Sequence, residues 1–372
     1  MKKLLMIGPG QRHNIKPFLD YFQEEDTPFK LTYLSTGPFK YDRSNYNSIG
    51  IKELRRNPFS FISFLKLLRR DFDLIWYHGA YHWPLVLAIN LVKSNDTKLN
   101  LNIWGERIPR VALKNTIMGR FYRWALEKAD FVQCNWFGTE EIVKEAQPKA
   151  NTNIQVWGLH NSYFKELPTE DNYQNETLEF VSHLPQTKTK FFFPKSLTPA
   201  NRHDLLVSAA SKLVSKGVSN FTIYFWLGRE DPDLLRKLKT QIERKQVSDQ
   251  VKIVKMPFLP FMDMKYIWTK MDCGLQIVDH DQLSSTVIEP LFMEKELVIS
   301  NIRPYQILNN KFDLHLQLTD NNVNSIAKKL EEKITGNRTH EDVLKKRKEI
   351  VKTEFSFRDN IKKMVSFYYK AI

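Results

Sequence analysis

The chain has 372 residues, of which 42% are hydrophobic and 13% aromatic, so it can bury the cores of two domains, and wholesale disorder is excluded. Its 56 lysines and arginines exceed its 42 aspartates and glutamates by 14. Such an excess favours a polyanionic partner, which would be nucleic acid, an anionic membrane surface or a phosphorylated substrate. Two isolated cysteines exclude a disulfide framework and a zinc cluster built on cysteine.

The first apolar run, Leu4–Ile7, is short and is followed by Gly8 and Gly10. This pattern predicts a buried first strand rather than a signal peptide. The longest apolar stretches fall far short of the roughly 20 residues that a membrane-spanning helix needs. We therefore expect a cytoplasmic protein that is not integral to a membrane.

The first half of the chain alternates short apolar runs with segments of helical periodicity, a pattern typical of a parallel sheet. The expected strands are Leu4–Ile7, Lys30–Leu34, Asp73–Tyr77, Leu99–Ile103, Phe131–Gln133 and Ile154–Val156. The expected helices are Ile15–Phe22, Phe59–Leu68, Trp83–Val92, Lys114–Ala129 and Gly138–Glu145.

Residues 165–178 are polar, acidic and turn-rich, which predicts a linker. The alternation of strands and helices then restarts. We therefore expect an α/β protein with two facing, doubly wound parallel-sheet domains, residues 1–164 and 179–354. The expected strands are Lys190–Phe193, Phe221–Trp226, Val251–Lys255, Gly274–Val278 and Leu297–Ser300. The expected helices are Asp204–Ser215, Asp233–Arg244, Met262–Lys270, Val287–Met293, Val323–Thr335, Glu341–Thr353 and Asp359–Ala371.

Residues 281–289, after an expected strand, carry the strongest local signal. Ser284, Ser285 and Thr286 stand where a helix begins, and a helix N-terminus offers free N–H groups and a positive dipole end to a phosphate. Asp281 could accept hydrogen bonds from sugar hydroxyls, and Glu289 could hold a ribose diol. The structural alternative is a capping box formed by Thr286 and Glu289.

Two further pairs of residues follow expected strands and could approach a ligand. Lys195 and Arg202 could neutralise a diphosphate at the same helix start, although both could also be solvated surface charges. Gly8 and Gly10 could let a ligand approach the backbone closely, but no GxGxxG pattern supports a nicotinamide site. Zinc, nucleophile-elbow and P-loop patterns are absent from the sequence, so we expect neither a metal nor a cofactor.

His78 and Glu106 follow two neighbouring strands of the first domain. A histidine or glutamate at the carboxyl end of a strand could orient or deprotonate an acceptor hydroxyl. The alternative is that such a histidine is a hydrogen-bonded structural residue.

The basic excess is concentrated in residues 52–70. Phe61, Phe64, Leu65 and Leu68 recur at helical spacing, and lysines and arginines flank them. An aromatic, basic, amphipathic helix of this kind can lie in an anionic membrane interface. The alternative is a core-facing helix with a charged outer face. Nucleic acid is the least favoured partner, because no nucleic-acid-binding fingerprint occurs.

Four segments, in this order, resemble motifs of the GT-B fold glycosyltransferases, particularly the family 4 bacterial sugar transferases. The last two are the family's pair of acids with seven residues between them, where Asp281 replaces the first glutamate, and the family's closing helix. The segments are Phe72–Gly79 (FDLIWYHG), Ile154–Phe164 (IQVWGLHNSYF), Asp281–Glu289 with the following PLFMEKELVIS, and Phe355–Tyr369.

The resemblance implies a deep cleft between two Rossmann-like domains, with helix 355–372 crossing back to the first. It implies that Glu289 bonds a nucleotide ribose, that Asp281 contacts the donor hexose, and that Ser284, Ser285 and Thr286 hold the diphosphate with Lys195 or Arg202. The expected activity is metal-independent hexosyl transfer from a nucleotide diphosphate sugar to a hydroxyl of a glycan.

The expected acceptor is a lipid-linked glycan of bacterial surface polysaccharide synthesis, at the cytoplasmic face of the cell membrane. Two alternatives remain: another GT-B enzyme, such as a nucleotide-sugar epimerase, and a non-catalytic sugar-binding or membrane-binding module.

Overall fold

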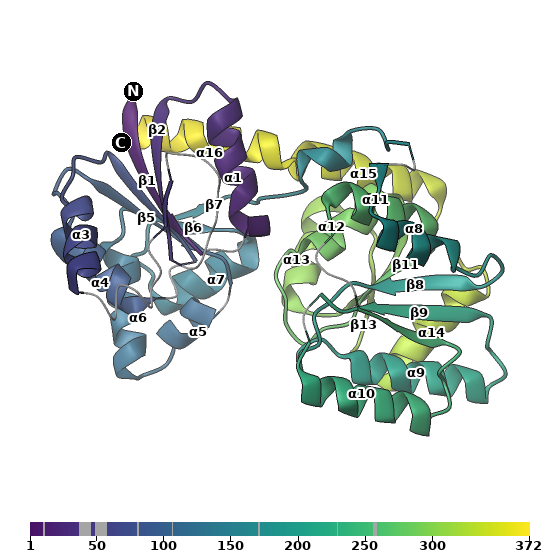
Figure 1. The fold of residues 1–372 in the computed structure, drawn as a ribbon. Helices are drawn as coiled ribbons and strands as arrows, with labels where there is room; N and C mark the ends of the chain where they lie inside the picture. The colour runs from purple at the N-terminus through teal and green to yellow at the C-terminus, as the bar shows by residue number, and fades with distance from the viewer. Residues whose placement is uncertain are drawn as a thin grey trace. The chain divides into compact units, whose positions relative to one another are not determined.

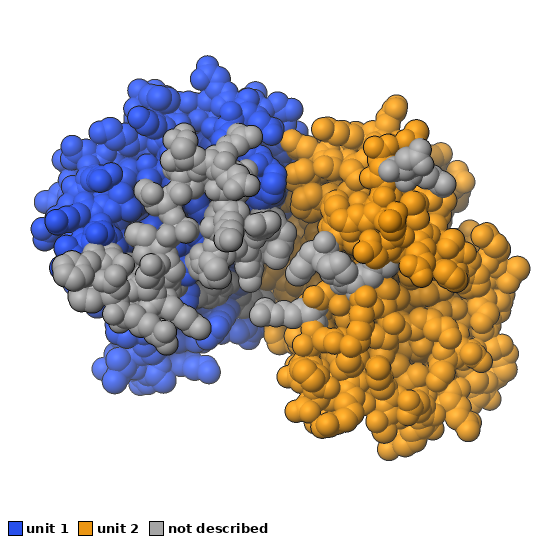
Figure 2. Space-filling view, viewed as in Figure 1, with its two compact units in different colours: residues 1–157, 357–372 blue, residues 158–356 orange. Residues whose placement is uncertain are grey.

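The computed structural model describes residues 1–9, 12–36, 46–48, 58–79, 82–105, 107–169, 172–228, 230–255 and 259–372, with backbone alone at 12–14, 46–48 and 58–61. The chain divides into two compact units (Figure 2). Unit 1 comprises Met1–Trp157 and Phe357–Ile372, and unit 2 comprises Gly158–Ser356.

The boundary between the units differs from the expected linker, because residues 165–178 belong to unit 2. The first segment of unit 1 ends instead at Trp157, and unit 2 begins at Gly158. Gly158 has a φ of +83°, and a Cβ there would lie 2.1 Å from the carbonyl oxygen of Phe355. The backbone N–H of Leu159 donates to that same carbonyl at 2.6 Å. The two segments therefore approach too closely for any residue but glycine.

Unit 1 is built on a sheet of seven described strands, all parallel, in the order β3-β2-β1-β4-β5-β6-β7 (Figure 1). These strands are β1 Lys2–Gly8, β2 Phe29–Ser35, β3 Tyr46–Ser48, β4 Leu74–His78, β5 Lys98–Ile103, β6 Phe131–Cys134 and β7 Thr152–Ile154. The helices are α1 Arg12–Glu24, α3 Pro58–Leu68, α4 Trp83–Val92, α5 Arg107–Ala112, α6 Ile117–Lys128, α7 Phe137–Ala146 and α16 Phe357–Ala371.

Apolar side chains on both faces of this sheet are buried, as in doubly wound folds. Ile15 and Phe18 of α1 and Tyr368 of α16 pack on one face. The C-terminal helix therefore returns to unit 1, as the resemblance implied. Residues of α3, α4 and α6 pack on the other face.

Helix α3 occupies the middle of the basic segment at 52–70. Phe64 and Leu68 are fully buried in the core of unit 1, and Leu65 packs against that core. The core-facing alternative therefore holds for these side chains, because an apolar face already covered by a sheet cannot enter a membrane interface. Residues 52–57 and the side chain of Phe61 lie outside the described part of the chain.

Unit 2 contains a second sheet of described parallel strands, in the order β10-β9-β8-β11-β12-β13. The strands are β8 Thr189–Phe193, β9 Phe221–Trp226, β10 Val251–Val254, β11 Cys273–Gln276, β12 Glu296–Ser300 and β13 Gln317–Thr319. The helices are the 3-10 turn η1 Asn161–Phe164, α8 Asn175–Ser182, α9 His203–Ser215, α10 Pro232–Arg244, α11 Phe261–Lys270, α12 Ser285–Phe292, α13 Arg303–Phe312, α14 Val323–Ile334 and α15 Glu341–Glu354. In the parts of both units that the structure describes, no helix combines the length and the apolar character needed to cross a membrane.

Candidate functional site

Three of the predicted residues meet in unit 2, at the carboxyl ends of β8 and β11. The ammonium of Lys195, just after β8, lies 2.6 Å from Oδ2 of Asp281 and donates to Oγ of Ser284 at 3.1 Å. Parallel strands end at the same edge of a sheet, which is why residues 86 positions apart become neighbours. An ammonium has three donors, and the described hydrogen bonds use two of them.

The carboxylate of Asp281 is the centre of this arrangement. Its Oδ2 accepts hydrogen bonds from Lys195, from Gln276 Nε2 at 2.6 Å, from Tyr305 OH at 2.8 Å and from Ser284 Oγ at 3.0 Å. The backbone N–H of Gln282 donates to Oδ1 at 2.7 Å. Four of these donors converge on Oδ2, whereas Oδ1 accepts one and keeps a second acceptor site. Asp281 thus positions Lys195, and its contact with a donor hexose stays a prediction.

The environment of Asp281 also sets its charge. Burial by itself would raise the pKa of the carboxyl, but the positive charge and hydrogen bond of Lys195, with the donors of Tyr305 and Gln282, hold that pKa below its usual value. The site therefore contains an ionised Asp281 at neutral pH, beside the side chain of Lys195.

Helix α12 begins at this network. Ser284 is its N-cap residue, but the Ser284 side chain makes no capping hydrogen bond to the helix backbone. Its hydroxyl bonds to Asp281 and to Thr286 Oγ1 at 2.8 Å. The predicted alternative, a capping box of Thr286 and Glu289, is wrong, because Ser284 rather than Thr286 is the cap. The positive end of the α12 dipole therefore lies next to Lys195, with Ser285 exposed.

Glu289 lies inside unit 2, and only 5% of its surface is exposed. Its Oε2 accepts a hydrogen bond from the indole N–H of Trp268 at 2.8 Å. Burial raises the pKa of Glu289, and the bond from Trp268 opposes that rise. The carboxyl group is thus fixed in orientation by α11, one turn into α12.

Arg202 is not part of this network. Its guanidinium makes two 3.0 Å hydrogen bonds to Asp204 and a 3.1 Å bond to Asp279. Within the described part of unit 2, Lys195 is therefore the cation beside Ser284, and Arg202 is occupied by carboxylates. The sequence placed both cations in one loop but could not tell which would turn toward α12.

The predicted residues of unit 1 have different surroundings. His78 ends β4 with 2% of its surface exposed, and the rings of Phe18, Trp76 and Trp157 surround it. Asn102 Nδ2 lies 3.2 Å from its Nδ1. Burial lowers the pKa of His78 to about 3, so it is neutral at physiological pH. This burial argues against the predicted catalytic role and fits the structural alternative.

Of the other predicted residues of unit 1, Gly8 belongs to the described part of the chain. Gly8 ends β1, where a Cβ would meet Ile15 at 2.9 Å, so its small size serves the packing of α1. Gly10 and Glu106 lie outside the described residues. Among the residues that are described, no group of three or more His, Cys, Asp or Glu side chains could hold a metal ion.

Two site residues were missed from the sequence. Gln276 ends β11 and donates to both Asp281 and Tyr305, the second at 2.7 Å. Its position at a strand end was a usable signal, but the strand was expected to continue to Val278. Tyr305 belongs to α13, a helix that the sequence pattern did not indicate.

Comparison with known proteins gives the fold. No protein-family model matches the sequence, and no curated protein matches it. Solved structures do match along the whole chain. A glycosyltransferase from Rickettsia africae ESF-5 is 17% identical, with a TM-score of 0.72 and coverage of 99% of this chain and 98% of the other.

Anabaena Alr3699/HepE, solved in complex with UDP, is 12% identical, with a TM-score of 0.78 and full coverage of both chains. Sucrose-phosphate synthase from Thermosynechococcus elongatus is also 12% identical, with a TM-score of 0.77, covering 100% of this chain and 99% of the other. The chain has the GT-B fold. In GT-B terms, each of its units is one Rossmann-like half, as predicted, and the Lys195 network lies at the carboxyl edge of the C-terminal half.

Proposed function

We propose that this GT-B protein is a glycosyltransferase that moves a hexose from a nucleotide diphosphate sugar to a hydroxyl group of a glycan. The observation that carries the proposal is the ammonium of Lys195 beside the N-terminus of α12. The Anabaena neighbour was also solved in complex with UDP-glucose, which supports a uridine diphosphate sugar as the first donor to test.

In the proposed mechanism, the donor diphosphate lies against Lys195 and the start of α12. The bond between the anomeric carbon and the phosphate oxygen breaks, the acceptor oxygen bonds to that carbon, and the acceptor proton is released. Negative charge grows on the departing diphosphate. The third N–H of Lys195 and the first N–H groups of α12 stabilise this charge, and they are already oriented before reaction.

Roles for the neighbouring acids follow from their contacts. Asp281 holds Lys195 and Ser284 in place. Glu289, held by Trp268, is proposed to bond the nucleotide ribose. We place the protein with the family 4 type of GT-B enzymes because of this pair of acids at the start of α12.

The acceptor and the location belong to the proposal as well. We propose a lipid-linked glycan of bacterial surface polysaccharide synthesis, reached from the cytoplasmic face of the cell membrane. The excess of 14 positive charges supports an anionic surface as a partner.

The test is a panel of nucleotide sugars and free nucleotides, scored by thermal stabilisation. A ligand present at 100 times its dissociation constant stabilises the folded protein by about 2.7 kcal/mol, which raises the melting temperature by several degrees. We expect one nucleotide class to do so. A panel in which no nucleotide diphosphate shifts the melting temperature would contradict the proposal.

Two variants test whether donor binding depends on Glu289. Glu289→Gln keeps an acceptor for Trp268 while replacing the carboxyl group, and we expect it to weaken donor affinity by about tenfold. Glu331→Gln, on α14, is the matched control. An epimerase would release an altered nucleotide sugar without any acceptor, and a binding module would bind the donor without consuming it, so product analysis separates the alternatives.

A further inference from the structure

Large apolar side chains are exposed at one corner of unit 1. Ile117, the first residue of α6, is 87% exposed, Leu113 is 41% exposed, and Trp83, the first residue of α4, is 44% exposed. The ring of Trp83 lies 5.8 Å from that of Phe121, one helical turn beyond Ile117. Trp83, Phe121 and Ile117 therefore lie along one apolar row, and Leu113 precedes α6 by four residues. We call these four residues the α4–α6 corner.

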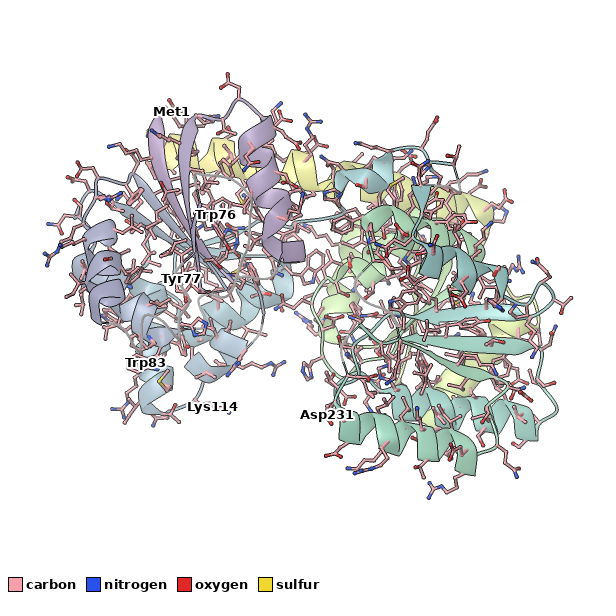
Figure 3. The ribbon with its side chains drawn as sticks, viewed as in Figure 1. Met1, Trp76, Tyr77, Trp83, Lys114 and Asp231 are labelled. Atoms are coloured by element: carbon pink, nitrogen blue, oxygen red, sulfur yellow. The ribbon has the colours of Figure 1, made fainter. Side chains whose placement is uncertain are left out.

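Exposed cations occur in the same stretch of sequence as this apolar row. Arg107, Lys114 and Arg120 are all exposed, and the sequence from Arg107 to Leu126 contains no aspartate or glutamate. Figure 3 shows Trp83 and Lys114 at the same end of unit 1, opposite Met1. The corner thus combines exposed apolar side chains with cations from a stretch of sequence that contains no acid. Exposed apolar groups that lie together mark a candidate interaction surface.

The corner is held rigidly, so its exposed side chains are not the result of a loose loop. The Oγ1 atom of Thr116 caps α6 by accepting a 3.0 Å hydrogen bond from the backbone N–H of Gly119. A Cβ on Gly119 would lie 2.0 Å from the carbonyl oxygen of Lys114, so the turn closes only around glycine. The guanidinium of Arg123 donates to the carbonyl oxygens of Ala112 and Lys114. These bonds fix Leu113 and Ile117 in outward positions.

We propose that the α4–α6 corner docks unit 1 on an anionic lipid membrane, with Trp83, Leu113 and Ile117 entering the interface and Arg107, Lys114 and Arg120 contacting lipid phosphates. Charge complementarity selects an anionic surface, and exposed aliphatic side chains select lipid over nucleic acid, which offers them no apolar phase. Tryptophan is suited to the boundary because it has an apolar ring and a polar N–H.

The location of the corner fits the proposed acceptor. Helix α5 follows the carboxyl end of β5, and α4 follows that of β4, and ligands of such sheets bind beyond these strand ends. The inference rests on the proposed function for its membrane-linked acceptor. The α4–α6 corner replaces the 52–70 segment as the proposed contact surface, because Phe64 and Leu68 of that segment are buried in the core of unit 1.

The test measures binding of the full chain to vesicles by cosedimentation, without any donor. Vesicles of phosphatidylcholine mixed with phosphatidylglycerol are compared with vesicles of phosphatidylcholine alone. The R107Q/K114Q/R120Q protein should bind the anionic vesicles about 100-fold more weakly, at about fivefold per cation. The L113S/I117S protein should bind them about tenfold more weakly. Added salt should weaken wild-type binding.

The matched control is R236Q/K237Q/K239Q, which removes the same charge from the exposed face of α10 in unit 2. Its vesicle affinity should stay within about threefold of wild type. Equal weakening by both triple variants, or wild-type binding by the L113S/I117S protein, would overturn the docking surface. So would a corner variant that loses binding to RNA or polyglutamate but keeps its binding to anionic vesicles.

Donor affinity, measured separately by thermal stabilisation, distinguishes this inference from the proposed function. The corner variants should retain it, because the corner lies in unit 1 and the donor network in unit 2. Loss of vesicle binding by every protein including wild type, with donor affinity intact, would overturn the docking surface and leave the proposed function standing.

Discussion

His78 ends β4 in unit 1, and Gln276 ends β11 in unit 2, so the two side chains have corresponding places in two parallel sheets. His78 is enclosed by aromatic rings, and burial lowers its pKa to about 3. Gln276 instead joins Asp281 and Tyr305 in a hydrogen-bonded network that reaches Lys195. A strand end thus locates a candidate residue, but the helices that cover it decide whether the residue stabilises the fold or meets a ligand.

The largest effect expected from this contrast is the pH dependence of unit 1. The pKa of His78 is about 3 in the folded protein against 6.5 for an ordinary histidine, so protonation stabilises the unfolded chain. The free energy of unfolding therefore keeps its full value above pH 6.5 as far as His78 is concerned. It falls toward pH 3 by up to about 1.4 kcal/mol per pH unit. Hydrogen exchange of β4 peptides measures this loss.

The comparison uses His78→Gln, which removes the titrating group, and His183→Gln at an exposed position as its control. The difference in protection between wild type and His78→Gln should change between pH 6.5 and pH 5, while His183→Gln should follow wild type. A pH-independent difference would show that His78 is accessible and titrates normally.

The next effect concerns Asp281 of unit 2. Asp281→Asn leaves Lys195 without its ion-pair partner and should lower the free energy of unfolding by about 3 kcal/mol at pH 7. The pKa of Asp281 lies below its usual value, so this stabilisation is present at neutral pH and declines as the pH falls below about 4. Denaturant unfolding of unit 2 at pH 7 and in mild acid measures the free energy lost in Asp281→Asn and how that loss depends on pH. An equal loss of unfolding free energy at the two pH values would contradict the account.

The smallest effect expected is that of Tyr305. Tyr305→Phe removes one donor to Asp281 and one acceptor for Gln276 but leaves the ion pair with Lys195. The expected loss in unfolding free energy is about 1 kcal/mol. Tyr369→Phe, at an exposed position of α16, should be neutral. A Tyr305→Phe loss as large as that of Asp281→Asn would mean that Tyr305, and not Lys195, holds the carboxylate.

Most of the regular elements could be predicted because their patterns are local. Phe221–Trp226 is a continuous apolar run and forms β9 over the same residues. The expected helix Lys114–Ala129 instead begins at Ile117 and is preceded by a separate helix, α5. Its start depends on the Thr116 cap and on the close approach at Gly119, which helix propensity does not reveal.

The candidate site was predicted only in part, for a related reason. Lys195 and Ser284 follow strands directly, so the edge of the sheet indicated that they would meet. The side-chain hydrogen bond of Glu289 with Trp268 joins α12 to α11, and that of Asp281 with Tyr305 joins the loop before α12 to α13. Such contacts depend on how α11 and α13 pack, and no sequence spacing encodes them.

The most direct test of the account is the affinity for UDP, measured by calorimetry on wild type, Lys195→Met and Lys190→Met. Lys190 lies at the opposite end of β8, paired with Asp272 at 3.0 Å, and serves as the matched control. The account predicts that Lys195→Met binds UDP about 10–100-fold more weakly, since it loses charge-assisted hydrogen bonds to the diphosphate, while Lys190→Met binds as wild type does. Equal UDP affinity in Lys195→Met and wild type would contradict the assignment of the diphosphate site.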